Sequence, residues 1–167
     1  MIVGVVVFAF MLVEAVRAAR NERHQRERGG IEPRGDVYRL MQVAYPGMFV
    51  AMVAEAAWQG MPPPALAAVG AVLFAAAKAL KWWAIRALGQ AWTFRVIVVP
   101  GTTAIAAGPY RHLRHPNYVA VVGEILGVAL MTGARVTGPL AFVVFGALLA
   151  RRILVENRAL GAILRRH

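Results

Sequence analysis

Long apolar stretches separated by short polar connections dominate the chain. A helix needs about 20 apolar residues to cross the hydrocarbon core of a bilayer, and three stretches approach that length. Two shorter apolar stretches follow, joined by a tight link that contains Gly133 and Gly138 and is typical of a helical hairpin. We therefore predict an all-α integral membrane protein with about five transmembrane helices and a C-terminal helical hairpin. The expected spans are 2–18, 38–58, 64–87, 118–131 and 139–154.

Composition supports a membrane protein. Hydrophobic residues make up 59% of the 167 positions, against roughly 45–50% in soluble domains, and the mean hydropathy is +0.57. The length fits one domain, 1–167, with three membrane helices in 1–87 and a polar motif followed by the hairpin in 88–167. Because the chain has no cysteine, disulfides, cysteine metal sites and thiol nucleophiles are excluded.

The positive charges predict how the helices are oriented. Lys and Arg number 19 against 8 Asp and Glu, and they collect in blocks between apolar stretches. Residues 59–63, in the second connection, carry no charge. Around the first connection lie seven arginines: Arg17, Arg20, Arg23, Arg26, Arg28, Arg34 and Arg39. Since Lys and Arg are retained on the cytoplasmic side, we expect the N-terminus outside and the C-terminus inside a bacterial inner membrane.

The net charge of +11 is compatible with two kinds of negatively charged partner. Arginines next to a membrane attract anionic lipids. Nucleic acid is the other possibility, but no recognised nucleic-acid motif accompanies these arginines. We therefore expect membrane lipids as partners and no nucleic acid.

A dense polar motif precedes the fourth apolar stretch. Residues 108–118 contain two prolines, two histidines, two arginines and two tyrosines. Residues 88–107 before it alternate apolar side chains with helix breakers, which predicts an amphipathic stretch at the cytoplasmic interface. One interpretation of the motif is an interfacial belt, in which Tyr and His face lipid headgroups, Arg extends to water and Pro116 starts the next helix. The other interpretation is a functional site.

The motif resembles that of the isoprenylcysteine carboxyl methyltransferase family. That family has Gly-x-Tyr, then Arg-His-Pro-x-Tyr before a membrane helix, and later Arg-x-x-x-Glu in the last helix. The matching residues are Gly108 and Tyr110; Arg114, His115, Pro116 and Tyr118; and Arg152 with Glu156. The resemblance covers roughly residues 82–160 and implies a membrane enzyme that uses S-adenosyl-L-methionine as cofactor.

The resemblance also implies which residues form the site. Arg152 is expected to face the methyl acceptor, and the cofactor pocket is expected to be open to the cytosol. The residues implied to surround the cofactor are the stretch 102–105, with Thr102, Thr103 and Ile105, together with Tyr110, His115, Pro116, Asn117, Tyr118 and Glu156.

The chemistry of methyl transfer suits these residue types. Transfer requires positioning and the exclusion of water, with no metal and no protein nucleophile. The Glu156 carboxylate can hold the cofactor's ammonium group or offset its sulfonium charge, and Arg152, at i−4, can orient an anionic oxygen. The alternative for this pair is an ordinary salt bridge near a helix end.

Glu124 lies inside an apolar stretch, where a carboxylate is costly and often functional. It is a candidate general base for a hydroxyl acceptor, or else a structural partner for Lys78, Lys81 or Arg86. We expect Glu14 to pair with Arg17 at i+3 on its own helix.

The leading hypothesis is an S-adenosylmethionine-dependent O-methyltransferase of a lipid-like substrate. The acceptor is either a prenylcysteine carboxylate or a polyketide lipid such as an alkylpyrone or alkylresorcinol. Residues 80–83 and 95–98 resemble small bacterial enzymes of the latter kind, and the Ala- and Arg-rich composition is typical of GC-rich bacterial genomes. The alternatives are a phospholipid N-methyltransferase and a non-enzymatic small transporter or structural subunit.

Overall fold

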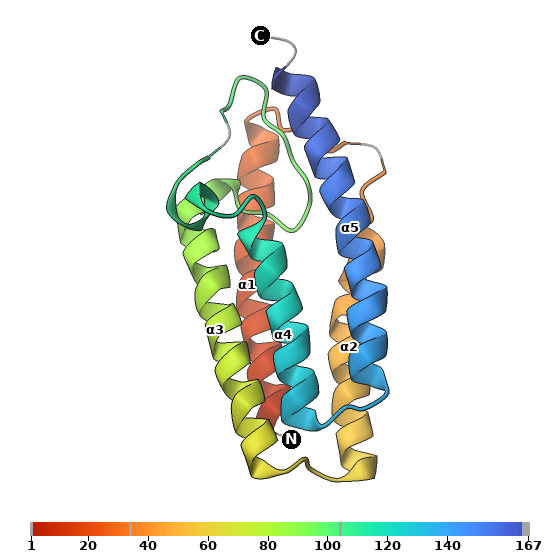
Figure 1. Cartoon of the computed structure of the whole chain (residues 1–167). Coiled ribbons are helices and arrows are strands. Elements are labelled where there is room, and N and C mark those ends of the chain that lie inside the picture. The colour runs from red at the N-terminus through yellow and green to blue at the C-terminus, as the bar shows by residue number, and fades with distance from the viewer. Residues whose placement is uncertain (1, 34, 104, 165–167) are drawn as a thin grey trace.

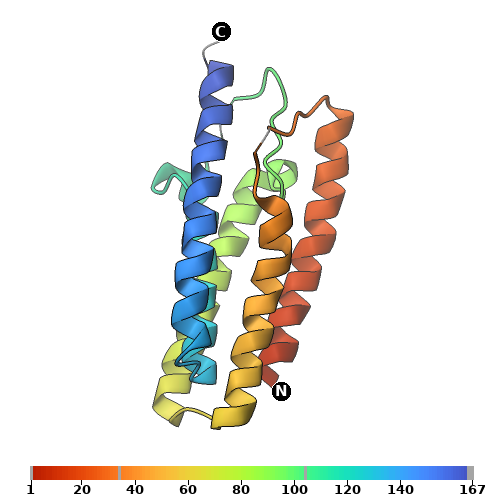
Figure 2. The same cartoon turned by 90° about the vertical axis from the view of Figure 1, so that its right-hand side faces the viewer.

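Five helices run side by side in an elongated bundle (Figures 1 and 2). The computed structural model describes residues 2–33, 35–103 and 105–164. The helices are α1 (Ile2–Glu27), α2 (Tyr38–Gln59), α3 (Pro64–Leu88), α4 (Pro116–Thr132) and α5 (Thr137–Leu164), with short 3-10 turns η1 (Gly89–Ala91) and η2 (Gly108–Arg111) between α3 and α4. Arg34, Arg165 and Arg166, counted in the charge pattern, and Ala104, in the expected cofactor stretch, lie outside the described residues.

The predicted fold class is confirmed. Four helices are long and apolar enough to cross a membrane, and α4 is a shorter apolar helix of 17 residues. The middle three helices begin and end within about two residues of the expected spans. The outer two are longer, since α1 continues through its arginines to Glu27 and α5 continues to Leu164. The first glycines after the α1 arginines are Gly29 and Gly30, so nothing earlier interrupts that helix.

The connections separate into two ends of the bundle. The N-terminus, the α2–α3 link and the α4–α5 link lie at one end (Figures 1 and 2). The α1–α2 link, the long segment between α3 and α4, and the C-terminal part of α5 lie at the other, which we call the loop end. At the loop end α4 starts well short of the ends of α1 and α5 (Figure 1). All connections that carry many arginines are therefore at the loop end.

The α4–α5 link is stabilised by hydrogen bonds. Gly133 adopts a left-handed conformation, φ 65°, after α4, and its backbone N–H reaches the carbonyls of the last helical turn. The Glu55 carboxylate accepts hydrogen bonds from the backbone N–H groups of Val136 and Thr137 at 3.0 and 2.8 Å. Glu55 thus supplies the cap that the start of α5 needs and joins it to α2.

Helices α3 and α4 are in close backbone contact because glycines face each other. A Cβ atom added to Gly127 would lie 2.8 Å from the backbone nitrogen of Phe74, and one added to Gly70 would lie 2.6 Å from the Gly127 carbonyl oxygen. A Cβ added to Gly123 would lie 2.9 Å from that of Ala77. Small residues at such contacts are typical of helices packed in membranes.

Large apolar side chains occupy both the centre and the outer surface of the bundle. Phe49, Met52 and Phe145 are buried in the core between the helices. Other apolar residues point outward, such as Val72 on α3 and Val143 on α5, which are 71% and 66% exposed. An outer surface of this kind suits hydrocarbon rather than water.

Candidate active site

A cavity of about 520 Å³ opens at the loop end. Side chains from all five helices and from residues 91–98 line it. Six of the residues that the family resemblance singled out are among them: Tyr110, His115, Asn117, Tyr118, Arg152 and Glu156. The polar motif and the end of the last helix, far apart in sequence, thus meet at one cavity.

The start of α4 orients the motif side chains. Pro116 is buried and occupies the first helical position, where its missing N–H is not needed. The rings of His115 and Tyr118 stack with centroids 5.4 Å apart. The Tyr118 hydroxyl donates a 2.7 Å hydrogen bond to Glu156 Oε2, and His115 Nδ1 lies 3.7 Å from the same oxygen. Glu156 is therefore held directly by the motif.

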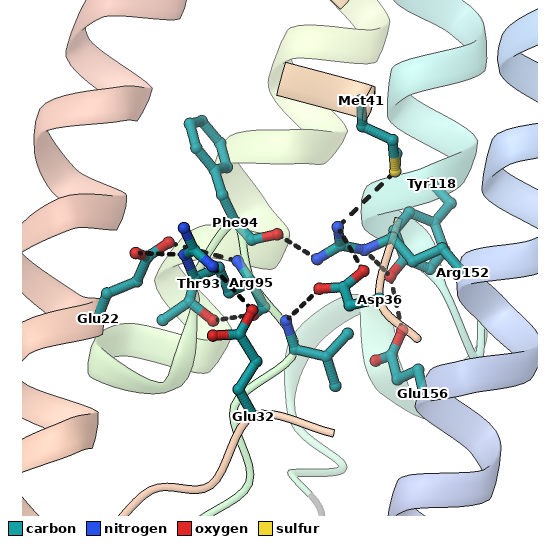
Figure 3. Close-up of polar contacts among 11 residues, drawn as sticks. Glu22, Glu32, Asp36, Met41, Thr93, Phe94, Arg95, Tyr118, Arg152 and Glu156 are labelled. Carbon is teal, nitrogen blue, oxygen red and sulfur yellow. Dashed lines mark hydrogen bonds and ion pairs between the residues drawn. The ribbon is translucent and has the colours of Figure 1, made fainter. Parts of the chain in front are cut away.

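Arg152 joins three segments of the chain (Figure 3). Its Nε donates to the Tyr118 hydroxyl at 3.0 Å, its Nη1 lies 3.5 Å from Asp36 Oδ1, and its Nη2 donates to the Phe94 carbonyl. Among the described residues, Arg152 reaches Glu156 only through Tyr118, so the two do not form the simple salt bridge that their spacing allows. Asp36 instead provides the counter-charge.

Residues 92–98 form a strap across the loop end. Trp92 is buried and its carbonyl accepts a 2.7 Å hydrogen bond from Asn21. The backbone N–H of Val96 donates to Asp36 Oδ2 at 3.3 Å, and Ile31 pairs with Val98 in an antiparallel bridge. The expected amphipathic stretch is thus an irregular segment whose apolar residues pack onto the bundle.

Arg95 fixes the outer edge of this strap (Figure 3). Its guanidinium pairs with Glu32 at 2.8 Å and with Glu22 at 3.5 Å, and it lies over the ring of Tyr38 with its central carbon 4.4 Å from the centroid. These contacts attach the strap to the ends of α1 and α2.

Two features of the cavity suit a bound cofactor. His115 Nε2 is buried and finds no hydrogen-bond partner within the described part of the chain, and a buried polar atom of this kind normally has one. The Glu156 side chain is 30% exposed, so its carboxylate can still meet a ligand. Burial and the negative charge of Glu156 raise the pKa of Tyr110, which therefore stays a neutral hydroxyl.

The remaining expected cofactor residues are located differently. Thr102, Thr103 and Ile105 are exposed and do not line the cavity. Pro116 is buried at the start of α4 and does not line the cavity either. A cofactor role for the stretch 102–105 stays a prediction.

A buried ring of four charges lies next to the cavity. Lys78 Nζ is 2.7 Å from Glu14 Oε1 and 3.2 Å from Glu124 Oε2. Lys81 Nζ is 3.1 Å from Glu14 Oε2 and 2.9 Å from Glu124 Oε1. The Tyr45 hydroxyl donates a hydrogen bond to Glu124 Oε2. We call these four charged side chains the ion ring; it joins α1, α3 and α4, and Tyr45 adds α2.

The contacts of the ion ring test two predictions about buried carboxylates. Pairing of Glu124 with Lys78 and Lys81 is confirmed, and Glu124 itself does not line the cavity. The expected pair of Glu14 with Arg17 is wrong, because Glu14 is buried against the two lysines and Arg17 lies over the Trp82 ring instead. Because Glu14 is buried, the two buried ammonium groups beside it supply the counter-charge that a carboxylate needs away from water.

Sequence reasoning missed two residues that the site depends on. Asp36 lies in the expected connection between the first two spans, yet its carboxylate pairs with Arg152 and accepts a hydrogen bond from the backbone of the strap. Tyr45 lies inside an expected apolar span, yet its hydroxyl donates a hydrogen bond to Glu124. The sequence carries a signal only for the ion ring that Tyr45 joins, since two carboxylates and two lysines inside apolar stretches imply mutual pairing.

Comparisons with known proteins identify the family of the chain. The sequence profile of the isoprenylcysteine carboxyl methyltransferase family matches residues 68–162. An uncharacterized protein of Bacillus subtilis (strain 168), YpbQ, is 31% identical over 147 residues, which cover 88% of this chain and 88% of the relative. An uncharacterized protein of Haemophilus influenzae (strain ATCC 51907 / DSM 11121 / KW20 / Rd) is 25% identical over 122 residues, or 72% and 71% of the two chains. No solved structure matches the chain. Since the profile covers more than half of the sequence, including the motif and most of the last helix, the protein belongs to the isoprenylcysteine carboxyl methyltransferase family.

Proposed function

We propose that this protein is an S-adenosylmethionine-dependent O-methyltransferase that acts on a lipid-like acceptor. The observation that carries the proposal is the meeting of His115, Tyr118 and Glu156 at one cavity inside an apolar bundle. Membership of a methyltransferase family supports it.

The cofactor side of the cavity would use four side chains. Glu156 offers a carboxylate for the cofactor's positive charges, and His115 Nε2 offers a buried atom that still needs a hydrogen-bond partner. Tyr110 and Asn117 line the cavity beside them. S-adenosylmethionine supplies an electrophilic methyl group, so the protein has to position the acceptor and exclude water. The strap, with buried Trp92 and Val96, serves the second purpose.

The acceptor side suits an amphiphile. Apolar residues from several helices line the cavity alongside the polar ones, among them Met11, Ala15, Met41 and Leu149. An alkyl chain gains free energy from each methylene that such a lining removes from water. Arg152 borders the same space and is our candidate for a contact with the acceptor.

For topology, we propose that the loop end faces the cytoplasm and the N-terminus lies outside. The clustering of Arg20, Arg23, Arg26 and Arg28 at the loop end supports this, because such residues are retained inside. The site would then open to the compartment that contains S-adenosylmethionine. The bacterial relatives are compatible with an inner membrane.

The direct test is methyl transfer by the purified protein. We expect methyl-labelled S-adenosylmethionine and a bacterial lipid extract to give a labelled lipid with the wild type and much less of it with His115→Ala when the cofactor is below saturation. Mild base releases the label from an ester but leaves it on an ether or an amine, and product mass separates the last two, so phospholipid N-methylation is recognised. A folded protein that fails to bind S-adenosylmethionine in calorimetry would instead be a non-enzymatic membrane protein.

A further inference from the structure

The cavity has a second polar end, away from the residues assigned to the cofactor. Glu14, Tyr45 and Lys81 line it there, with Glu124 behind them. Glu124 follows Tyr118 by six residues, or about 9 Å along α4. The ion ring therefore lies deeper in the bundle than Tyr118 and Glu156.

The direction of one hydrogen bond determines what this deep end can bind. Glu124 pairs with both Lys78 and Lys81, so it is an ionised carboxylate and can only accept hydrogen bonds. The single proton of the Tyr45 hydroxyl is committed to Glu124 Oε2. Only the lone pairs of the Tyr45 oxygen remain, so a ligand group that meets Tyr45 has to bring its own hydrogen.

The charge balance points the same way. The ion ring holds two carboxylates and two ammonium groups, with a net charge of zero. Within the ion ring itself, a neutral ligand keeps that balance, whereas an anionic one adds a charge that none of the four side chains is left to pair. The other Lys and Arg side chains at the cavity already have carboxylates beside them, since Arg152 lies 3.5 Å from Asp36 and Arg95 lies 2.8 Å from Glu32. Among the described residues, no Lys or Arg side chain at the cavity is thus left without a counter-charge.

We propose that Tyr45 and Lys81 form the acceptor subsite and that it takes the neutral hydroxyl group of an amphiphile, such as a long-chain phenol. This inference rests on the methyltransferase function proposed above and selects a hydroxyl over a carboxylate acceptor. The Tyr45 oxygen accepts the hydrogen bond of the hydroxyl, and the acceptor's alkyl chain lies along the apolar lining. The Tyr45 ring packs against the rings of Phe49 and Phe145, with centroid distances of 4.9 and 5.1 Å, and these contacts fix its position.

The same contacts give the hydroxyl proton a route. The proton moves to the Tyr45 oxygen while the Tyr45 proton moves to Glu124 Oε2, so Tyr45 stays neutral and Glu124 becomes a neutral acid. Lys81 then loses one of its two anionic partners just as the acceptor oxygen becomes an anion. The total charge of ring and acceptor stays zero throughout.

Binding of two matched probes tests the subsite without requiring turnover. We would titrate pentadecylresorcinol and its dimethyl ether, which cannot donate a hydrogen bond, and follow the change in tryptophan fluorescence, to which Trp92 in the cavity wall contributes. The wild type should prefer the phenol by about tenfold or more, the usual effect of a hydrogen bond to a partner in a charged network. Tyr45→Phe should abolish that preference and leave the affinity for the ether unchanged.

Tyr38→Phe is the matched control, because Tyr38 is a second tyrosine of α2 at the same cavity but packs under Arg95. It should retain the preference for the phenol. A wild type that binds both probes equally, or a folded Tyr45→Phe variant that still prefers the phenol, would overturn the proposal. So would tighter binding of palmitate, a carboxylate probe, than of the phenol.

If Tyr45→Phe did not fold, wild type labelled with fluorotyrosine would decide. The chain has four tyrosines, and Tyr→Phe changes at the other three assign the Tyr45 resonance by elimination. The phenol must shift that resonance and the ether must not. S-adenosylmethionine affinity, measured in parallel, separates the two proposals. If the protein prefers the phenol but does not bind S-adenosylmethionine, the methyltransferase proposal is wrong and the subsite proposal stands. If it binds S-adenosylmethionine but does not prefer the phenol, only the subsite proposal is wrong.

Discussion

His115 and Tyr118 lie one turn apart at the start of α4 and share Glu156 as a neighbour. We expect His115→Ala and Tyr118→Phe each to weaken S-adenosylmethionine binding by about tenfold or more, because each removes a polar contact near a charged group. Isothermal calorimetry in detergent measures this directly. His112→Ala is the control, since His112 is three residues away and exposed. If both variants bound S-adenosylmethionine as tightly as the control does, the motif would be assigned to contact with lipid headgroups instead.

Glu156 and Arg152 lie on one face of α5 but are expected to affect different ligands. Glu156→Gln should raise the dissociation constant of the cofactor by about tenfold, the usual effect of losing one charge-assisted contact. Removing Arg152 should raise the acceptor KM and leave the cofactor constant within about threefold.

The design of the Arg152 variant follows from its partner. Arg152→Ala alone would leave Asp36 buried without its counter-charge, which destabilises a protein by about 3–5 kcal/mol. Arg152→Gln combined with Asp36→Asn avoids this, and Arg151→Gln, at an exposed neighbouring position, is the control. If the double variant changed only the cofactor constant, the assignment of Arg152 to the acceptor would have to be given up.

The role of Glu124 can be tested with the ion ring kept neutral. Glu124→Gln with Lys78→Met leaves one carboxylate and one lysine, Glu14 and Lys81, still 3.1 Å apart. Methylation of a phenol, with a pKa of about 10, should fall by about 10²–10⁴. Methylation of a carboxylate, which arrives ionised, should stay within about tenfold if it occurs at all. An equal loss for both acceptors, with cofactor affinity intact, would make Glu124 purely structural; product formation by mass spectrometry is the measurement.

At the scale of the helices, the close contact of α3 and α4 is the most sensitive to substitution. Gly127→Ala adds a methyl group 2.8 Å from the Phe74 backbone nitrogen and forces the two helices apart. We expect it to destabilise the protein by about 1–3 kcal/mol. Gly146→Ala on α5 is the control, since its Cβ would meet nothing within 4 Å, and it should be neutral or slightly stabilising. Thermal unfolding in detergent compares them; equal midpoints would mean that the contact adapts at little cost.

The helices could be predicted from sequence because their signals are local. The middle three apolar stretches are bounded by proline or glycine, as Pro64, Pro116 and Gly133 show, and such breakers act within a few residues. The ends of α1 and α5 were predicted too early because charged residues continue a helix as well as apolar ones do. Polarity reports where a membrane ends, not where a helix ends.

The site could be predicted only in part, because its other contacts join distant segments. The family resemblance supplied His115, Tyr118, Arg152 and Glu156, whose contacts the structure then brought together. The partnership of Asp36 with Arg152 spans more than a hundred residues, and no pattern near Asp36 indicates it. The strap lies within the predicted amphipathic stretch, but its burial was not predicted, since that depends on contacts with α1, α2 and α5.

For the whole molecule, the orientation in the membrane is the testable property. The chain lacks cysteine, so single cysteines can be introduced without a background. Arg28→Cys lies at the loop end and Met61→Cys in the α2–α3 link, and both side chains are exposed. In intact cells we expect a membrane-impermeant maleimide to label position 61 and to spare position 28, as the arginine distribution requires. The opposite labelling pattern would invert the proposed topology.

The short fourth helix has a consequence for how the two substrates are supplied. At 17 residues α4 is about 25 Å long, against about 39 Å for the 26 residues of α1, and a bilayer core measures about 30 Å. The polar motif that starts α4 is therefore recessed to the depth where headgroups meet acyl chains. A water-soluble cofactor would reach the motif from the bulk solution, whereas an amphiphile would reach it by lateral diffusion within the membrane. The concentration that governs saturation by the acceptor is then its mole fraction in the leaflet, and dilution of the whole membrane in buffer leaves that quantity unchanged.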